Sequence, residues 1–292
     1  MALLIAAGSQ SGTDDVSPVS RTFAWLVFAL TFGLLLSDYM SRQVLNAVFP
    51  MLKAEWGLSD TQLGSLGGIV ALMVGLLTFP LSLLADRWGR VKCLTIMAAL
   101  WSLATLACGL ARSYEEMFAA RFLVGVGEAA YGSVGLAVIL SVFPARLRAT
   151  LSGAFMAGGM FGSVLGMAAG GVVAAQFGWR WAFVSVAIFG LAMSVLYPLV
   201  VSERRLRGGA AAPAIPAPGS VGARMGFVEL FGWLFRCRTI VWVYLGSALQ
   251  LFIAGSLMTW LPSFLNRYYD LPTDRAGVGA AVFVLLGALG MV

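Results

Sequence analysis

The chain has 292 residues, of which 60% are hydrophobic and only 11% are charged, and its mean hydropathy is +0.90. A soluble globular domain carries about 25% charged residues, so the composition excludes an ordinary soluble protein and indicates lipid as the main solvent. The net charge of +6 does not indicate nucleic-acid binding, because the basic residues stand in short loops beside apolar runs.

The apolar runs predict membrane-spanning helices. They reach about 17 residues or more and do not alternate as the strands of a barrel do. Only helices and closed barrels satisfy their backbone hydrogen bonds in lipid. The expected fold class is therefore all-α integral membrane.

Histidine is absent, and the three cysteines, Cys93, Cys108 and Cys237, lie far apart. This excludes histidine proton relays, histidine metal sites and Ser-His-Asp chemistry. The cysteine spacing allows no disulfide framework and no CxxC metal pair. We expect buried thiols, no metal site, no cofactor and no enzymatic activity.

Residues 1–22 are polar and predict a disordered N-terminus. Residues 23–201 predict an N-terminal six-helix transmembrane domain. Its six spans are Phe23–Met51, Leu63–Ala85, Leu94–Ala111, Met117–Phe143, Leu151–Phe177 and Trp181–Val201.

Residues 202–239 predict a linker. Ser202–Met225 is basic and then rich in alanine, proline and glycine, a composition that predicts flexibility. Phe227–Phe235 is short and amphipathic, which favours a place in the membrane interface. Two further spans, Ile240–Leu265 and one from Ala276 to Val292, begin an incomplete second transmembrane domain, residues 240–292.

The basic residues predict the orientation. When the loops are taken alternately, one set holds twelve lysines and arginines and the other holds five, while Arg42 and Arg121 lie inside spans. Positive residues favour the cytoplasmic side. The N-terminus and the linker are therefore predicted to be cytoplasmic.

The loop between the second and third spans carries a motif of charged residues and glycine. It contains Asp86, Arg87, Gly89 and Arg90 and resembles the major facilitator signature G-x-L-a-D-r-x-G-r-[kr], with Ser82 in place of the first glycine. An acid at this point can meet an arginine or a helix N-terminus, and glycine permits the tight reversal. The resemblance implies a gating loop.

The fourth span holds Arg121, Gly125, Gly127, Glu128 and Tyr131. The glycines also fit a dinucleotide fingerprint, but no strand precedes them, so that interpretation fails. The run is similar to the fourth span of major facilitators and, together with Tyr39–Pro50, to the Spinster-like branch.

Typical members of that branch carry Asp-Arg in span one. Arg42 matches the arginine, whereas Ser41 stands where the aspartate is expected. We expect Asp38, one turn earlier, to substitute.

Glycine recurs every four residues in the fifth span, at Gly158, Gly162, Gly166 and Gly170. This spacing forms one slowly drifting stripe on a helix. Small residues let helices approach closely in lipid, so we expect the stripe to face another helix.

The charges inside spans are the candidate site for substrate and coupling. Asp38 and Arg42 share a helical face, and counting residues at 1.5 Å each places Arg42 and Glu128 at one depth. Burying a charged side chain inside a membrane span costs free energy, so such a residue suggests a functional role. A purely structural ion pair remains the alternative. The wider set of candidates adds Arg121, Asn46, Tyr131 and Gln250.

The resemblance implies the first half of a twelve-helix major facilitator bundle, followed by two helices of the second half, so we expect a truncated chain. It implies a secondary transporter of an organic, anionic or amphipathic, lysophospholipid-like solute, with proton coupling left open. The alternatives are a proton-coupled symporter of small organic anions and a membrane protein that does not transport. The expected partners are the solute, protons and the bilayer, with no nucleic acid and a monomeric state. The expected location is a bacterial inner membrane.

Overall fold

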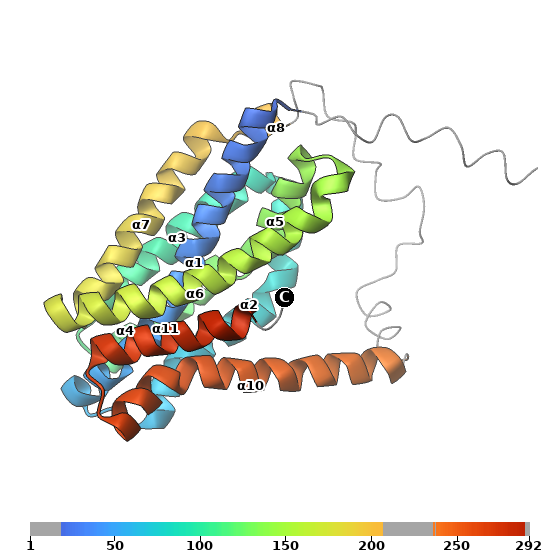
Figure 1. Ribbon diagram of the computed structural model, residues 1–292. Coiled ribbons are helices and arrows are strands. Elements are labelled where there is room, and N and C mark those ends of the chain that lie inside the picture. Colours follow the sequence, from blue (N-terminus) through green and yellow to red (C-terminus); the bar gives the residue numbers. More distant parts are fainter. Residues whose placement is uncertain (1–18, 207–235, 237, 290–292) are drawn as a thin grey trace, which may run out of the picture.

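The computed structural model describes residues 19–206, 236 and 238–289, and within these ranges the chain is helical with no strand (Figure 1). The predicted disordered N-terminus, the interfacial segment and Cys237 lie wholly or mostly outside the described residues. Seven helical segments of the described chain are long and apolar enough to cross a membrane. The all-α membrane fold predicted from composition is thereby confirmed.

The helices of the first half follow the predicted spans. They are α1 Arg21–Trp56, α2 Asp60–Trp88, α3 Arg90–Leu110, α4 Tyr114–Glu128, α5 Tyr131–Val142, α6 Arg148–Phe177 and α7 Trp179–Val200, with a 3-10 turn at Ala145–Leu147. A four-residue helix α8, Glu203–Leu206, then occupies the start of the predicted linker. The second half contributes α10 Arg238–Tyr269 and α11 Thr273–Leu289.

Two details differ from the sequence prediction. The fourth span is broken into α4 and α5 at Ala129 and Ala130, directly after Glu128. Helix α1 begins at Arg21, capped by the hydroxyl of Ser20, and continues to Trp56. Apolar periodicity alone reveals neither the break nor the caps, because both depend on local hydrogen bonds.

The glycine stripe of α6, which the sequence predicted to face another helix, packs on α1. A Cβ atom at Gly166 would lie 2.8 Å from Cα of Met40, and one at Gly162 would lie 2.9 Å from the carbonyl oxygen of Leu36. Side chains at these positions would therefore push the two backbones apart. Gly158 and Gly170 complete the same contact.

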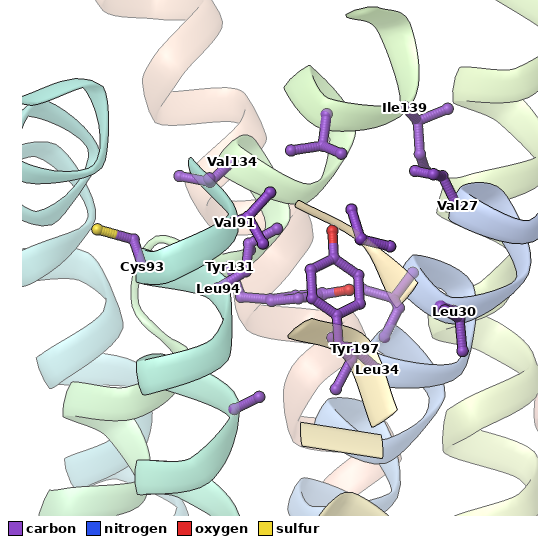
Figure 2. Packing of buried hydrophobic residues seen from close by; sticks show 14 of the residues in the cluster. Val27, Leu30, Leu34, Val91, Cys93, Leu94, Tyr131, Val134, Ile139 and Tyr197 are labelled. Atoms are coloured by element: carbon purple, nitrogen blue, oxygen red, sulfur yellow. The ribbon is translucent and has the colours of Figure 1, made fainter. Parts of the chain in front are cut away.

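The core of the inner end joins α1, α3, α5 and α7 (Figure 2). We call "inner" the end of the bundle that carries the loop between α2 and α3. Tyr131 and Tyr197 are fully buried there, and each hydroxyl contacts Thr31 of α1. Buried hydroxyls need such partners, so these contacts fix how α5 and α7 sit against α1.

The second half contacts the first at the outer end of the bundle. Residues 242–255 of α10 are exposed, whereas Pro262, Ser263 and Leu265 near its C-terminal end are buried. The ring of Trp260 lies 5.5 Å from that of Phe49.

Two more contacts close the outer end. Arg267 of α10 donates to both carboxylate oxygens of Asp60, at 2.9 and 2.7 Å. Helix α11 lies along α6, where a Cβ atom at Gly277 would be 2.7 Å from the carbonyl oxygen of Met167. The two halves therefore meet closely at their outer ends, while α10 diverges from the bundle toward its N-terminal end (Figure 1).

Candidate substrate and coupling site

A cavity of about 260 Å³ lies between α1, α2, the α4–α5 break and α6. It extends from mid-depth toward the inner end, where Met156 lies about two turns after the start of α6. Its polar wall comes from charged and hydroxyl-bearing side chains, and its apolar wall from aliphatic ones. The lining residues are Leu35, Asp38, Tyr39, Arg42, Val74, Thr78, Glu128, Ala129, Gly132, Ser133 and Met156.

Arg42 stands between two carboxylates. Its Nε atom lies 3.1 Å from Oδ1 of Asp38 and 2.9 Å from Oε2 of Glu128. The single N–H of this nitrogen forms its hydrogen bond with Asp38, so the contact with Glu128 is an ion pair without hydrogen-bond geometry. Oε2 of Glu128 thus has no hydrogen-bond partner within the described chain, although its side chain is fully buried.

The outer part of the Arg42 guanidinium is directed away from these carboxylates. The side chain is 28% exposed, compared with 4% for Asp38. Neither Nη atom has a hydrogen-bond partner within residues 19–206 and 238–289, and the guanidinium carbon lies 5.4 Å from the centre of the Tyr39 ring. A guanidinium in this position can bind a carboxylate or phosphate through two parallel hydrogen bonds.

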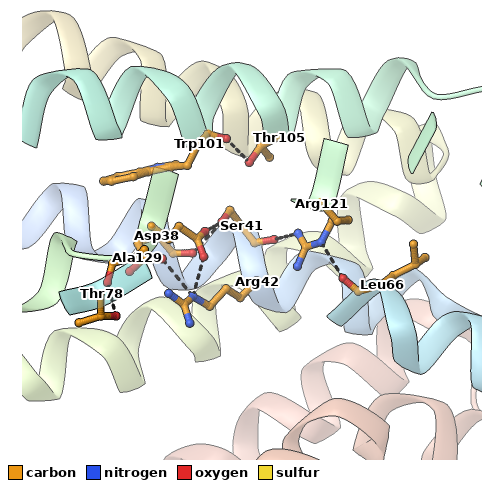
Figure 3. Close-up of polar contacts among 10 residues, drawn as sticks. Asp38, Ser41, Arg42, Leu66, Thr78, Trp101, Thr105, Arg121 and Ala129 are labelled. Atoms are coloured by element: carbon orange, nitrogen blue, oxygen red, sulfur yellow. Dashed lines mark hydrogen bonds and ion pairs between the residues drawn. The ribbon is translucent and has the colours of Figure 1, made fainter. Parts of the chain in front are cut away.

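Arg121 belongs to a neighbouring buried network rather than to the cavity wall (Figure 3). It is 1% exposed, and it donates to the carbonyl oxygens of Ser41 and Leu66, at 3.0 and 3.3 Å. The hydroxyl of Ser41 donates to Oε1 of Glu128 at 2.6 Å. Ser41 therefore connects the two networks from the position where relatives were expected to carry an aspartate.

The break between α4 and α5 lies at the cavity. The hydroxyl of Thr78 lies 2.6 Å from the carbonyl oxygen of Ala129, and Ser133 donates to the carbonyl oxygen of Ala130 at 3.0 Å. The carbonyl oxygen of Ala130 also accepts from the N–H of Val134 at 3.1 Å, so it keeps its helical partner, whereas the Thr78 hydroxyl joins α2 to the break. Sequence reasoning did not single out Thr78 or Ser133; the four-residue spacing of Thr78 and Ser82 in an apolar span was the available signal.

The structure brings some predicted site residues together and leaves others apart. Asp38, Arg42 and Glu128 meet at one depth, as predicted. Asn46 instead donates to Gln43 at 2.7 Å, and the Tyr131 hydroxyl donates to the carbonyl oxygen of Thr31. Gln250 is exposed on α10, and none of these last residues lines the cavity.

The predicted gating loop forms the turn between α2 and α3. Gly89 has φ of 99°, a value that favours glycine, and it separates the two helices. Asp86 and Arg90 form an exposed ion pair at 3.5 Å, and Arg87 is exposed. The pairing of the acid with an arginine agrees with the expectation from the motif.

Comparison with known proteins identifies the family. The sequence profile of the Major Facilitator Superfamily matches residues 31–292. The chain is 28% identical over 265 residues to the "Probable L-galactonate transporter" of Escherichia coli, covering 90% of this chain and 58% of that protein. It is 29% identical over 243 residues to the "Sphingosine-1-phosphate transporter SPNS2" of Danio rerio, covering 82% of this chain and 47% of that protein.

A solved structure of a transporter homologue has a similar fold. A bacterial homologue of the human lysosomal transporter Spinster, in an inward-facing and unoccupied conformation, matches with a TM-score of 0.80 at 26% identity. The match covers 93% of this chain and 61% of that one. The chain thus spans about half to three fifths of the length of the proteins it matches. It is a multi-pass membrane protein, and it belongs to the Major Facilitator Superfamily.

Proposed function

We propose that this chain is part of a secondary active transporter that moves an organic anion across the membrane by alternating access. The observation that carries the proposal is the cavity in which Arg42 is held by Asp38 and Glu128 while its Nη atoms have no hydrogen-bond partner in the described chain. An anionic headgroup that enters the membrane needs a cation to pair with, and the Arg42 guanidinium provides one at mid-depth. The relatives named above, a sugar-acid and a lipid-phosphate transporter by name, support an anionic solute.

The charge balance of the site favours coupling to protons. Asp38 and Glu128 pair with Arg42, and Ser41 connects Glu128 to the buried Arg121, so these four charges sum to zero when all are ionised. Entry of an anion adds a negative charge in a medium that disfavours it. Protonation of Glu128 would restore neutrality, and its Oε2 atom, which has no hydrogen-bond partner in the described chain, can accept the proton.

The shape of the cavity favours an amphipathic solute over a compact polar one. Its charged residues lie at mid-depth, whereas Leu35, Val74 and Met156 give it an apolar wall. An anionic headgroup on Arg42 would let a hydrocarbon chain lie along this wall. A small organic anion taken up with protons is the second candidate, and the similarity to the galactonate transporter supports it.

A flux experiment separates these functions. The chain is reconstituted in vesicles with a pH gradient, and entry of labelled L-galactonate and of a labelled lysophospholipid is measured. We expect uptake of one of them that depends on Arg42 and that slows when the gradient is dissipated. No uptake of either anion by the chain, in vesicles that contain correctly inserted protein, would reject transport by this polypeptide. Uptake that ignores the pH gradient would reject proton coupling alone.

The same proposal places the chain in a bacterial inner membrane with its N-terminus in the cytoplasm. The support is the excess of basic residues in the loops at the inner end. In this orientation the cavity extends from mid-depth toward the cytoplasm. The likeness to an inward-facing Spinster homologue agrees with that direction.

A further inference from the structure

The first turn of α3 has no cap from its own sequence. Its N-cap residue is Gly89, which has no side chain to accept a hydrogen bond. The first N–H groups of a helix lack partners inside the helix, so another group or water must accept them. Here the acceptor comes from far along the chain: Oε1 of Glu203 accepts from the backbone N–H of Val91 at 2.7 Å.

Glu203 is held in place by the segment that follows the sixth span. Ser202 accepts from the N–H of Arg205 at 3.3 Å, and Leu206 is buried, at 8% exposure, in the same core as Val91 and Cys93. Arg205 donates back to the carbonyl oxygen of Val200 at 3.1 Å, near the end of α7. These contacts anchor the short helix α8 on both sides of Glu203.

Gly89 leaves the space that the carboxylate occupies. A Cβ atom at this position would lie 3.0 Å from Oε1 of Glu203 and 3.5 Å from its Cδ atom. Any other residue at Gly89 would therefore press on the carboxylate as well as strain the turn, where φ is 99°. The close approach joins the loop between α2 and α3 to the end of the sixth span.

We propose that Glu203 is a positioning residue of the gating loop: it caps α3 from the end of the sixth span and thereby sets the position of Gly89 and Arg90. A carboxylate at a helix N-terminus is favoured by both the hydrogen bond and the helix dipole. The sequence motif left two partners open for Asp86, a helix N-terminus or an arginine, and Asp86 pairs with Arg90, so the acid at this helix N-terminus is Glu203. The effect on transport rests on the proposed function, whereas the effect on the loop does not.

Cys93 provides a direct readout of the loop. It lies in the first turn of α3 (Figure 2). Its N–H donates to the carbonyl oxygen of Gly89 at 3.1 Å, and the residue is 5% exposed. In a Cys237→Ser background, its reaction with a maleimide measures how often this turn opens. Cys108, which is fully buried farther along the same helix, should remain unlabelled and serves as the internal reference.

Three variants separate the hydrogen bond from the charge. Glu203→Ala removes both, Glu203→Gln removes the charge but keeps an oxygen acceptor, and Glu116→Ala is the matched control. Glu116 also accepts from a backbone N–H, that of Arg112 at 2.8 Å, but at the outer end of α4. We expect Glu203→Ala to label Cys93 roughly tenfold faster, the factor for losing one charge-assisted hydrogen bond, and Glu116→Ala to match the parent. Glu203→Gln should lie close to the parent.

The transport arm uses the same vesicles as the flux experiment. Glu203→Ala should lower the maximal rate while the half-saturating concentration stays unchanged, because the cavity is untouched, and Glu203→Gln should recover most of the rate. Unchanged Cys93 labelling in Glu203→Ala would overturn the positioning role. If Glu203→Ala labels Cys93 faster but transports at an unchanged maximal rate, Glu203 only stabilises the helix as a cap, and its link to gating is overturned. If the parent chain shows no flux, the proposed function fails, and the labelling result alone decides whether Glu203 positions the loop.

Discussion

Nε of Arg42 in α1 lies 2.9 Å from Oε2 of Glu128 in α4, and Nε also meets Oδ1 of Asp38 at 3.1 Å. The pair joins the first and fourth spans at the depth where the cavity begins. A buried ion left without its partner costs about 3–5 kcal/mol, so each of these residues constrains the other. This relationship links the folding of the first half to the chemistry we propose for it.

The first prediction concerns the outer end of the bundle. Arg267→Asp should slow transport, because it sets two negative charges face to face where Arg267 now donates to Asp60. The exchange of both charges, Asp60→Arg with Arg267→Asp, should recover part of the rate, because an arginine at position 60 pairs with the new aspartate but also meets Lys53. Initial uptake rates in vesicles provide the measurement.

Lys53→Gln is the matched control for this pair. Lys53 also contacts Asp60, at 2.7 Å, but it lies in α1 and does not join the two halves. Its loss should have little effect on uptake. Equal losses in Lys53→Gln and Arg267→Asp would show that the charge on Asp60, rather than the contact between halves, matters.

The second prediction concerns the gating loop. Asp86→Asn should reduce transport while insertion and expression stay near normal. The pair with Arg90 is exposed and spans 3.5 Å, so its contribution to stability is under about 1 kcal/mol. Uptake and the amount of folded protein are measured together, with Glu115→Gln at the opposite end of the bundle as a control. Normal uptake by Asp86→Asn would reduce the loop to a topology anchor.

The third prediction tests the packing of α6 on α1. Gly166→Ala should lower the melting temperature, because its Cβ atom would lie 2.8 Å from the backbone of Met40, and overpacking costs about 1–3 kcal/mol. Gly153→Ala, in the same helix, meets nothing within 4 Å and should be neutral or slightly stabilising. If both variants melt alike, the glycine stripe is not a packing surface.

Residue patterns in the sequence anticipated much of this arrangement. The lengths of the apolar runs predicted the membrane spans, and the four-residue glycine repeat predicted that α6 contacts another helix closely. Counting residues along the spans placed Arg42 at the same depth as Glu128. Each of these depends on helical periodicity, which a single sequence carries.

Other features depend on contacts between distant residues, which periodicity does not report. At the helix break after Glu128, the hydroxyl of Thr78 in α2 lies 2.6 Å from the carbonyl oxygen of Ala129, a contact between helices. The cap that Glu203 places on α3 joins residues more than a hundred positions apart. Asn46 and Tyr131 were expected at the cavity because they are polar, but each donates a hydrogen bond elsewhere in the bundle, to Gln43 and to the carbonyl oxygen of Thr31.

The fourth prediction concerns orientation. A reporter inserted between Gly208 and Val221 should be cytoplasmic, because twelve basic residues fall in the loops on that side and five on the other. Alkaline phosphatase and a fluorescent protein, fused at the same point, provide complementary signals. Phosphatase activity at this fusion would contradict the number of spans as well as the orientation.

The central claim is that Arg42 binds an anionic solute rather than only neutralising Glu128. Binding of L-galactonate and of a lysophospholipid is measured by the shift of the melting temperature across a ligand titration at several pH values. The variants are Arg42→Ala, Glu128→Gln and the two changes combined. Glu128→Gln should still bind but lose the dependence on pH, because the amide resembles the protonated acid.

The double variant gives the decisive result. Arg42→Ala leaves two carboxylates without their cation, Asp38 and Glu128, and the double variant leaves only that of Asp38, so the double variant should fold more stably than Arg42→Ala alone. If Arg42 contacts the anion, the double variant should nevertheless show no ligand-dependent shift at any concentration tested. Full binding by the folded double variant would contradict the account, since the pair would then be only structural.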